Sequence, residues 1–149
     1  MEKFIGNMDA KADAKGRVFV PVVFRRILHL AEETQLILRK NESQDCLTLF
    51  SKTQWEEELM QLRQKLNKWD AEQQGLFRHF SSQVEVMEMD GNGRILIPKK
   101  YLQMTGITHE VRFVGMYDSI ELWNPDRLEK ANLSLKDSQD SIKRFLVNT

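Results

Sequence analysis

Two aspartate–arginine pairs, each spaced four residues apart, occupy matching places in two similar segments of the chain. The pairs are Asp13 with Arg17 and Asp90 with Arg94, in D-A-K-G-R-V-F-V-P (13–21) and D-G-N-G-R-I-L-I-P (90–98). An arginine held beside a turn can present its planar fork of N–H donors to guanine O6 and N7 in the DNA major groove. On spacing alone, a structural ion pair is an equally good interpretation.

The matching segments indicate an internal duplication. They align without a gap at a constant offset of 77 residues, from Asp13 to Asp90, and the similarity continues beyond each proline. A repeat of this kind governs the interpretation of the whole fold. Each unit spans roughly fifty residues, which is small for a domain that must bury a core alone. We therefore expect the two units to pack against each other or against neighbouring chains.

The repeated segment reads as a β-hairpin followed by a short helix. Gly16 and Gly93 stand where a three-residue hairpin loop needs a left-handed backbone, which places each aspartate across from its arginine. An apolar strand follows each arginine, and the proline suits the first turn of a helix. Helices are predicted at 22–30 and 99–105, and further strands at 35–39, 46–50, 110–115 and 119–123.

A helical hairpin is predicted between the two units. An apolar stripe repeats with helical spacing, and the segment from Asp70 resembles a capping box that opens a second helix. We favour ordinary core packing over a ligand site for this stripe, which consists of Trp55, Leu59, Leu62, Leu66 and Trp69. The last residues, 129–149, read as a loose tail that ends in a short docking helix, with no assigned function.

Composition limits the possible functions. The 22 basic and 22 acidic residues give zero net charge, so any attraction to nucleic acid must come from a local patch. Residues 1–30 carry a net charge of +3, whereas residues 84–105 carry none. Cys46 is the sole cysteine, and no apolar run is long enough for a membrane span, so we expect a cytoplasmic protein. No cofactor is expected.

An enzyme is disfavoured by the residues that catalysis would need. The three histidines lie in unrelated segments, and the sequence shows no zinc-spaced cluster, nucleophile with a nearby base, or phosphate-binding glycine loop. The histidines are His29, His79 and His109.

The doubled D-x-x-x-R, each followed by an apolar triplet and a proline, resembles the signature of the MraZ family. Further matches are Phe4-Ile-Gly6, Phe24-Arg25, Trp55 and Phe80-Ser81. The resemblance implies an α+β fold: two tandem swapped-hairpin units of the AbrB type forming a pseudo-twofold β barrel, with a helical hairpin linker. The implied boundaries are 4–54 for the first repeat, 55–80 for the linker, 81–128 for the second repeat and 129–149 for the tail.

The resemblance also implies a function. Members of this family are sequence-specific DNA-binding regulators, commonly repressors, of the division and cell-wall gene cluster, and they form homo-oligomeric rings. A nucleoid location and promoter binding at spaced direct repeats follow. The residues expected to contact DNA are Lys11, Lys15, Arg17 and Arg94, with Asp13, Gly16, Asp90 and Gly93 supporting the turns.

Two departures from the family pattern set the second copy apart. Asn92 stands where the first copy has Lys15, and Leu102-Gln103 replaces an expected arginine. Both changes weaken the second copy as a DNA reader. A different class of function remains open, in which the protein is a ring-forming scaffold whose hairpins bind protein partners instead of DNA.

Overall fold

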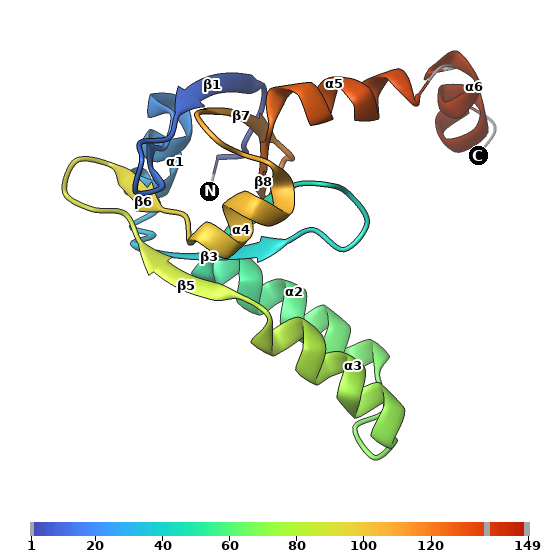
Figure 1. Ribbon diagram of the computed structural model, residues 1–149. Helices are drawn as coiled ribbons and strands as arrows, with labels where there is room; N and C mark the ends of the chain where they lie inside the picture. The colour runs from blue at the N-terminus through green and yellow to red at the C-terminus, as the bar shows by residue number, and fades with distance from the viewer. Residues whose placement is uncertain (1, 136–137, 148–149) are drawn as a thin grey trace.

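The computed structural model describes residues 2–135 and 138–147 and has an α+β fold, which confirms the class predicted from the sequence (Figure 1). Each half of the chain contributes strand, strand, short helix, strand and strand in that order. In the first half these are β1 (Asn7–Lys11), β2 (Arg17–Phe19), α1 (Val22–Leu30), β3 (Gln35–Lys40) and β4 (Leu47–Ser51). In the second they are β5 (Glu85–Glu88), β6 (Arg94–Leu96), α4 (Lys99–Thr105), β7 (Glu110–Gly115) and β8 (Ile120–Trp123).

The described strands form one six-stranded antiparallel sheet and one two-stranded ribbon. The sheet has the order β1-β7-β8-β4-β3-β5, and the ribbon pairs β2 with β6. Four of these pairings join the first half to the second. Three involve the strands that flank the turns, namely β1 with β7, β3 with β5, and β2 with β6, and the fourth is β4 with β8. The two halves are therefore interwoven, and neither half has a sheet of its own.

The two hairpins predicted at the Asp13–Arg17 and Asp90–Arg94 turns are correct at the turns themselves but wrong in the pairing of the flanking strands. In the first hairpin, the two strands are joined only by a single bridge between Ala12 and Val18. Beyond this bridge, β1 pairs with β7 and β2 pairs with β6. The later hairpins, β3 with β4 and β7 with β8, form as predicted. The flanking strands diverge because a partner from the other half lets both copies bury their apolar residues in one shared core.

One hydrophobic core joins the two halves. Val18, Val20, Ile95 and Ile97 point inward from the ribbon and are almost fully buried, together with Phe4 and Phe24, whose rings meet edge to face at 5.6 Å. Helices α1 and α4 begin directly after Pro21 and Pro98, as predicted, and α4 ends at Gly106 in the left-handed conformation.

The linker is a helical hairpin of α2 (Lys52–Lys65) and α3 (Ala71–Ser82), which projects from the sheet (Figure 1). Trp55 anchors it by packing on Phe50, with ring centroids 5.2 Å apart. The predicted stripe is too long, because α2 ends before Leu66, and Trp69 lies in the connection with 87% of its surface exposed. The Asp70 carboxylate caps α3 by accepting from the Gln73 backbone N–H, as expected of an N-cap.

The C-terminal segment continues as helices. Helix α5 (Pro125–Leu133) crosses the boundary expected between the second repeat and the tail, and α6 (Ser138–Ile142) leads into a π-helical turn at Lys143–Val147. The part of the tail prediction that covers residues 136–137 and 148–149 lies outside the described residues. Among the described helices, none is both long and apolar enough to cross a bilayer.

Candidate nucleic-acid interface

The first turn locks Arg17 to Asp13. One carboxylate oxygen of Asp13 accepts the backbone N–H groups of Lys15 and Arg17, each at 2.9 Å, and the other accepts from Arg17 Nε at 2.7 Å. Gly16 closes the turn with a φ of 89°, which only glycine adopts readily, and its N–H donates to the Asp13 carbonyl. The Arg17 side chain is therefore fixed at its Nε end.

The second turn repeats this geometry almost atom for atom. Asp90 accepts the backbone N–H groups of Asn92 and Arg94 at 2.9 and 3.0 Å, and Arg94 Nε donates to its second oxygen at 2.8 Å. Gly93 has a φ of 85°. Within the described part of the chain, neither arginine donates a hydrogen bond from its terminal Nη groups. Those groups are free to contact a ligand.

The hydrogen bonds keep both carboxylates ionised. The pKa of Asp13 is lowered, chiefly by the Arg17 backbone N–H and then by the Arg17 side chain. The pKa of Asp90 is lowered by the matching groups of Arg94. Both aspartates are surface groups, so solvent screening keeps the energetic contribution of each ion pair small. What the structure shows is that each aspartate fixes the Nε end of its arginine.

Each turn rests on a residue from the other half of the chain. A Cβ on Gly16 would lie 2.5 Å from the Ile97 carbonyl oxygen and 3.2 Å from the Leu102 side chain. A Cβ on Gly93 would lie 2.4 Å from the Arg25 side chain, and Arg25 Nη1 donates to the Asn92 carbonyl at 3.3 Å. Leu102 and Arg25 occupy equivalent positions of the two copies, 77 residues apart, so the halves support each other reciprocally.

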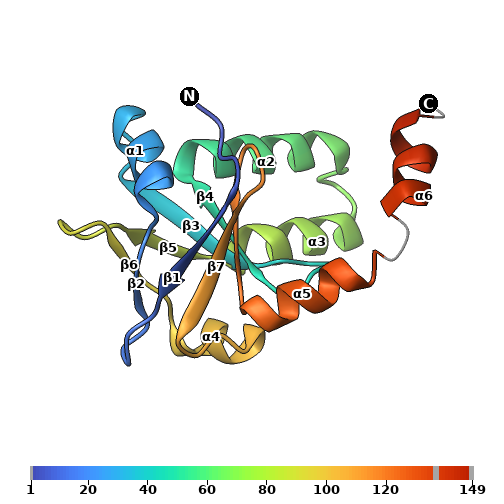
Figure 2. The same cartoon turned by 90° about the horizontal axis from the view of Figure 1, so that it is seen from above.

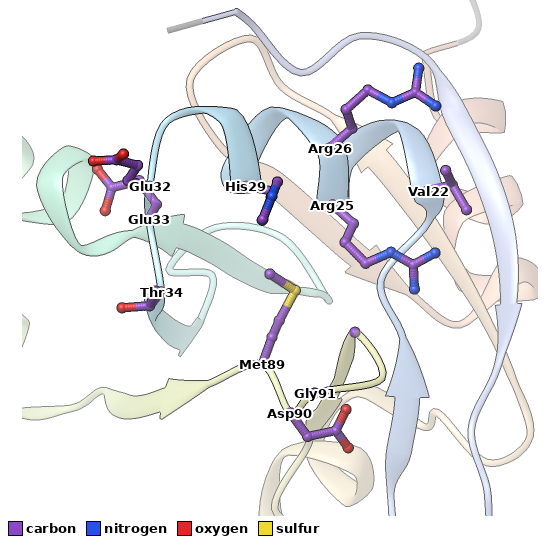
Figure 3. Close-up of a pocket in the computed structure, with 11 residues that line it drawn as sticks. Val22, Arg25, Arg26, His29, Glu32, Glu33, Thr34, Met89, Asp90 and Gly91 are labelled. Carbon is purple, nitrogen blue, oxygen red and sulfur yellow. The ribbon is translucent and has the colours of Figure 1, made fainter.

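Figure 3 shows the region around the second of these contacts. Arg25 extends from α1 toward the turn that carries Asp90 and Gly91, across a pocket of about 630 Å³ between helix and turn. The sequence does not reveal this contact of Arg25, since its partner lies 67 residues away in the chain. The contact also moves a positive charge to the second turn, which the charge count of residues 84–105 did not include.

The outward face of the β2–β6 ribbon brings the two motif arginines together. Arg17 lies opposite Leu96 and Phe19 lies opposite Arg94, so the arginines are diagonal neighbours at roughly 7–8 Å. Their side chains are 39% and 27% exposed, respectively. The two turns lie at opposite ends of the ribbon, because Ile97 pairs with Gly16 and Val20 pairs with Gly93. We call Arg17, Phe19, Arg94 and Leu96 the ribbon face.

The two lysines of the predicted site are placed differently. Lys15 lies exposed in the first turn, close to Arg17. Lys11 is also exposed, but it lies at the end of β1, in register with the acidic Glu110 of β7. The structure thus joins Lys15 to the arginines, whereas Lys11 belongs to the six-stranded sheet.

Two observations concern metal binding and thiol chemistry. The described residues contain no group of three or more His, Cys, Asp or Glu side chains that could hold a metal ion. Burial raises the pKa of the Cys46 thiol far above its usual range, so this cysteine is not a thiolate near neutral pH.

The fold and the ribbon face define a class: duplicated α+β proteins that present paired, turn-locked arginines from interwoven halves. The family model described as "MraZ protein, putative antitoxin-like" matches residues 4–78 and 80–144, so the chain belongs to the MraZ family.

Curated relatives carry the same family name. A protein of Bacteroides fragilis named "Transcriptional regulator MraZ" is 58% identical over 130 residues, covering 87% of this chain and 82% of the relative. A protein of the same name from Bacteroides thetaiotaomicron is 51% identical over 90% of this chain and 86% of its own length. A third relative of that name, from Phocaeicola vulgatus, is 49% identical over 97% of this chain and 94% of its own length. The relatives are thus named as regulators of transcription and not as enzymes.

Proposed function

We propose that the protein is a transcriptional regulator that binds double-stranded DNA sequence-specifically, with the β2–β6 ribbon facing the major groove. The names of its relatives support the regulatory part of this proposal. The major groove admits a two-stranded β-ribbon, and its base edges distinguish all four base pairs. No residue of the ribbon face is expected to carry out covalent chemistry.

One observation carries the proposal: two guanidinium groups are oriented on the same outward face while their terminal amino groups stay free. The Nε atoms are held by Asp13 and Asp90 at 2.7 and 2.8 Å, which reduces the number of conformations that must be lost on binding. Two free Nη groups in one plane match guanine O6 and N7, a bidentate pair worth about 1–3 kcal/mol of discrimination. Lys15 adds a cation at the first turn that suits a phosphate.

The finer fold assignment belongs to this proposal as well. We regard the exchanged pairing of β1 with β7, β3 with β5 and β2 with β6 as support for a swapped-hairpin, pseudo-twofold β barrel of the AbrB type. An arrangement with two related halves would explain why both arginines face the same way.

The protein further acts as a ring of identical subunits that binds spaced direct repeats in its own promoter and represses the adjoining division and cell-wall genes. A single ribbon face offers few cationic contacts, so one subunit alone would bind weakly. Linking several copies turns weak contacts into high overall affinity when the DNA repeats match their spacing. Chromosomal binding sites would place the protein at the nucleoid.

A mobility-shift titration tests this function directly. The full chain is titrated onto the DNA upstream of its own gene and onto a scrambled duplex of equal length, over a series of salt concentrations. We expect the upstream DNA to bind more tightly, and Arg17→Ala to lose this preference while the oligomeric state is unchanged. Equal affinity of the wild-type chain for both duplexes would rule the proposal out.

The scaffold function, in which the hairpins bind protein partners instead of DNA, stays as the second candidate because the ribbon between the two turns also exposes large apolar side chains, Phe19 and Leu96. The connection between α2 and α3, and α6, lie on the opposite side of the molecule from β2 and β6 (Figure 2). These regions expose large apolar side chains as well, Trp69 between α2 and α3 and Phe145 after α6. In the titration above, an oligomer that binds no DNA would favour this candidate.

A further inference from the structure

Two large apolar side chains stand exposed in the middle of the ribbon face. Phe19 is 53% exposed and Leu96 is 55% exposed, whereas their neighbours Val18, Val20, Ile95 and Ile97 are buried. Side chains alternate between the two faces of a strand, so Phe19 and Leu96 share the outward face with Arg17 and Arg94. The continuous apolar triplets Val18-Phe19-Val20 and Ile95-Leu96-Ile97 do not reveal this exposure by themselves.

Each apolar residue lies directly across the ribbon from an arginine. The Arg94 guanidinium lies 5.8 Å from the centroid of the Phe19 ring, and Leu96 is the cross-strand partner of Arg17. Directly opposed residues of an antiparallel pair have Cβ atoms about 4.5–5.5 Å apart. Neighbouring base pairs of B-DNA are about 3.4 Å apart along the axis. If an arginine contacts one base, the apolar residue opposite it on the other strand would therefore reach a base no more than about two base pairs away.

We infer that Phe19 and Leu96 determine specificity by contacting the 5-methyl groups of thymines that lie within two base pairs of the guanines read by Arg94 and Arg17. This inference rests on the proposed function of the ribbon. The thymine methyl is the main apolar group exposed in the major groove, and alanine, threonine methyl and phenylalanine side chains contact it in known complexes. The ribbon face thus pairs a guanine-reading group with a thymine-reading group twice.

Charge favours DNA over a second copy of this chain as the occupant of the ribbon face. The two apolar side chains lie between two guanidinium groups, and a symmetric contact between two such faces would bring four cations together. The only carboxylates that bond these arginines, Asp13 and Asp90, are already engaged through Nε within the described chain. A polyanion removes this repulsion while still covering the apolar surface.

Replacing thymine by uracil tests the inference, because uracil differs only by the missing methyl. The wild-type full chain first selects its preferred duplex from a random pool. Each thymine of that duplex is then replaced singly, and binding is measured by fluorescence anisotropy. We expect about a fourfold loss of affinity at thymines next to the selected guanines, as for one methyl removed from a buried contact. Thymines elsewhere in the duplex should tolerate the change.

Protein variants assign each methyl contact to a side chain. In Phe19→Ala and Leu96→Ala, the uracil substitution at the matching thymine should cost nothing further, even where the variant binds more weakly overall. Leu133→Ala removes a similarly exposed side chain far from the ribbon and should behave as wild type. Size-exclusion chromatography checks that every variant keeps its oligomeric state.

The outcomes separate this inference from the function on which it rests. If the wild-type chain selects no sequence, the proposed function fails and the inference fails with it. If it selects a sequence, and Arg17→Ala abolishes that selection, but no uracil substitution weakens wild-type binding, only the thymine contact is wrong. A fourfold loss that persists in both alanine variants would also overturn it, since the methyl would then touch another residue. Formation of dimers that bury Phe19 and exclude DNA would assign the face to a second copy.

Discussion

The two turns of this protein have nearly the same geometry and different charged surroundings. Both hold an arginine by an aspartate, with Nε to oxygen distances of 2.7 and 2.8 Å, and both close with a left-handed glycine. The first turn carries Lys15 and rests on Leu102, whereas the second carries Asn92 and rests on Arg25. Local sequence therefore sets the geometry of a turn, while the opposite half of the chain supplies part of its charge.

The glycines provide the largest test of this difference, because their neighbours differ in rigidity. In Gly16→Ala the new Cβ would meet backbone at 2.5 Å in a positive-φ conformation, so we expect a loss of roughly 2–4 kcal/mol in the free energy of unfolding. In Gly93→Ala the obstacle is the flexible Arg25 side chain, so roughly 1–2 kcal/mol is expected. Urea denaturation measures both.

Gly91→Ala is the matched control, since nothing lies within 4 Å of its Cβ position. We expect a change within about 0.5 kcal/mol, typical of a surface substitution. Equal losses for Gly16→Ala and Gly93→Ala would show that backbone conformation alone decides the cost, and that the two supports do not differ.

Substitution of the arginines tests whether the two turns contribute equally to sequence-specific DNA binding. Because both arginines lie on the ribbon face with free Nη groups, Arg17→Ala and Arg94→Ala should each cost about 1–3 kcal/mol of specific DNA binding. Arg17→Lys and Arg94→Lys should not retain the specific binding, since lysine lacks the planar fork of N–H donors. Anisotropy titrations with the selected duplex give the two values side by side. A loss for Arg17→Ala alone would restrict recognition to the first copy.

Acid should weaken both turns alike. The native pKa values of Asp13 and Asp90 lie below the unfolded value of 3.8, so the stability they contribute is complete above that pH. It is lost as pH falls below 3.8 and each carboxylate takes up a proton in the folded state. Asp13→Asn and Asp90→Asn should each flatten the decline of Tm below about pH 4 by a similar amount. An unchanged acid profile in both variants would contradict the assigned cause.

The smallest effect concerns the loop residues that differ between the turns. Lys15→Ala should reduce the slope of log affinity against log salt by about one per bound copy, with little change in sequence preference. Asn92→Lys gives the second turn the cation of the first and should raise the slope by about one if that turn also reaches the phosphates. A slope unaffected by Asn92→Lys would mean that the second loop points away from the DNA.

Sequence reasoning succeeded where a feature depends on residues close together in the chain. The turns at Gly16 and Gly93 and the helices after Pro21 and Pro98 formed as predicted, and each aspartate lies beside its arginine, as the turn geometry required. The stripe through Trp69 failed, since helical spacing cannot show where a helix ends. Phe19 and Leu96 were missed because a short apolar triplet does not reveal which of its residues faces outward.

The sequence by itself determined the duplicated turn, because the hydrogen bonds of Asp13 and Asp90 span no more than four residues. Only the tertiary structure decided that Arg17 and Arg94 share one face, that Arg25 supports the second turn, and that β2 pairs with β6. The physical reason is that neither half can bury its apolar strands alone. Each half completes the core of the other, and the composition of the ribbon face follows from that exchange.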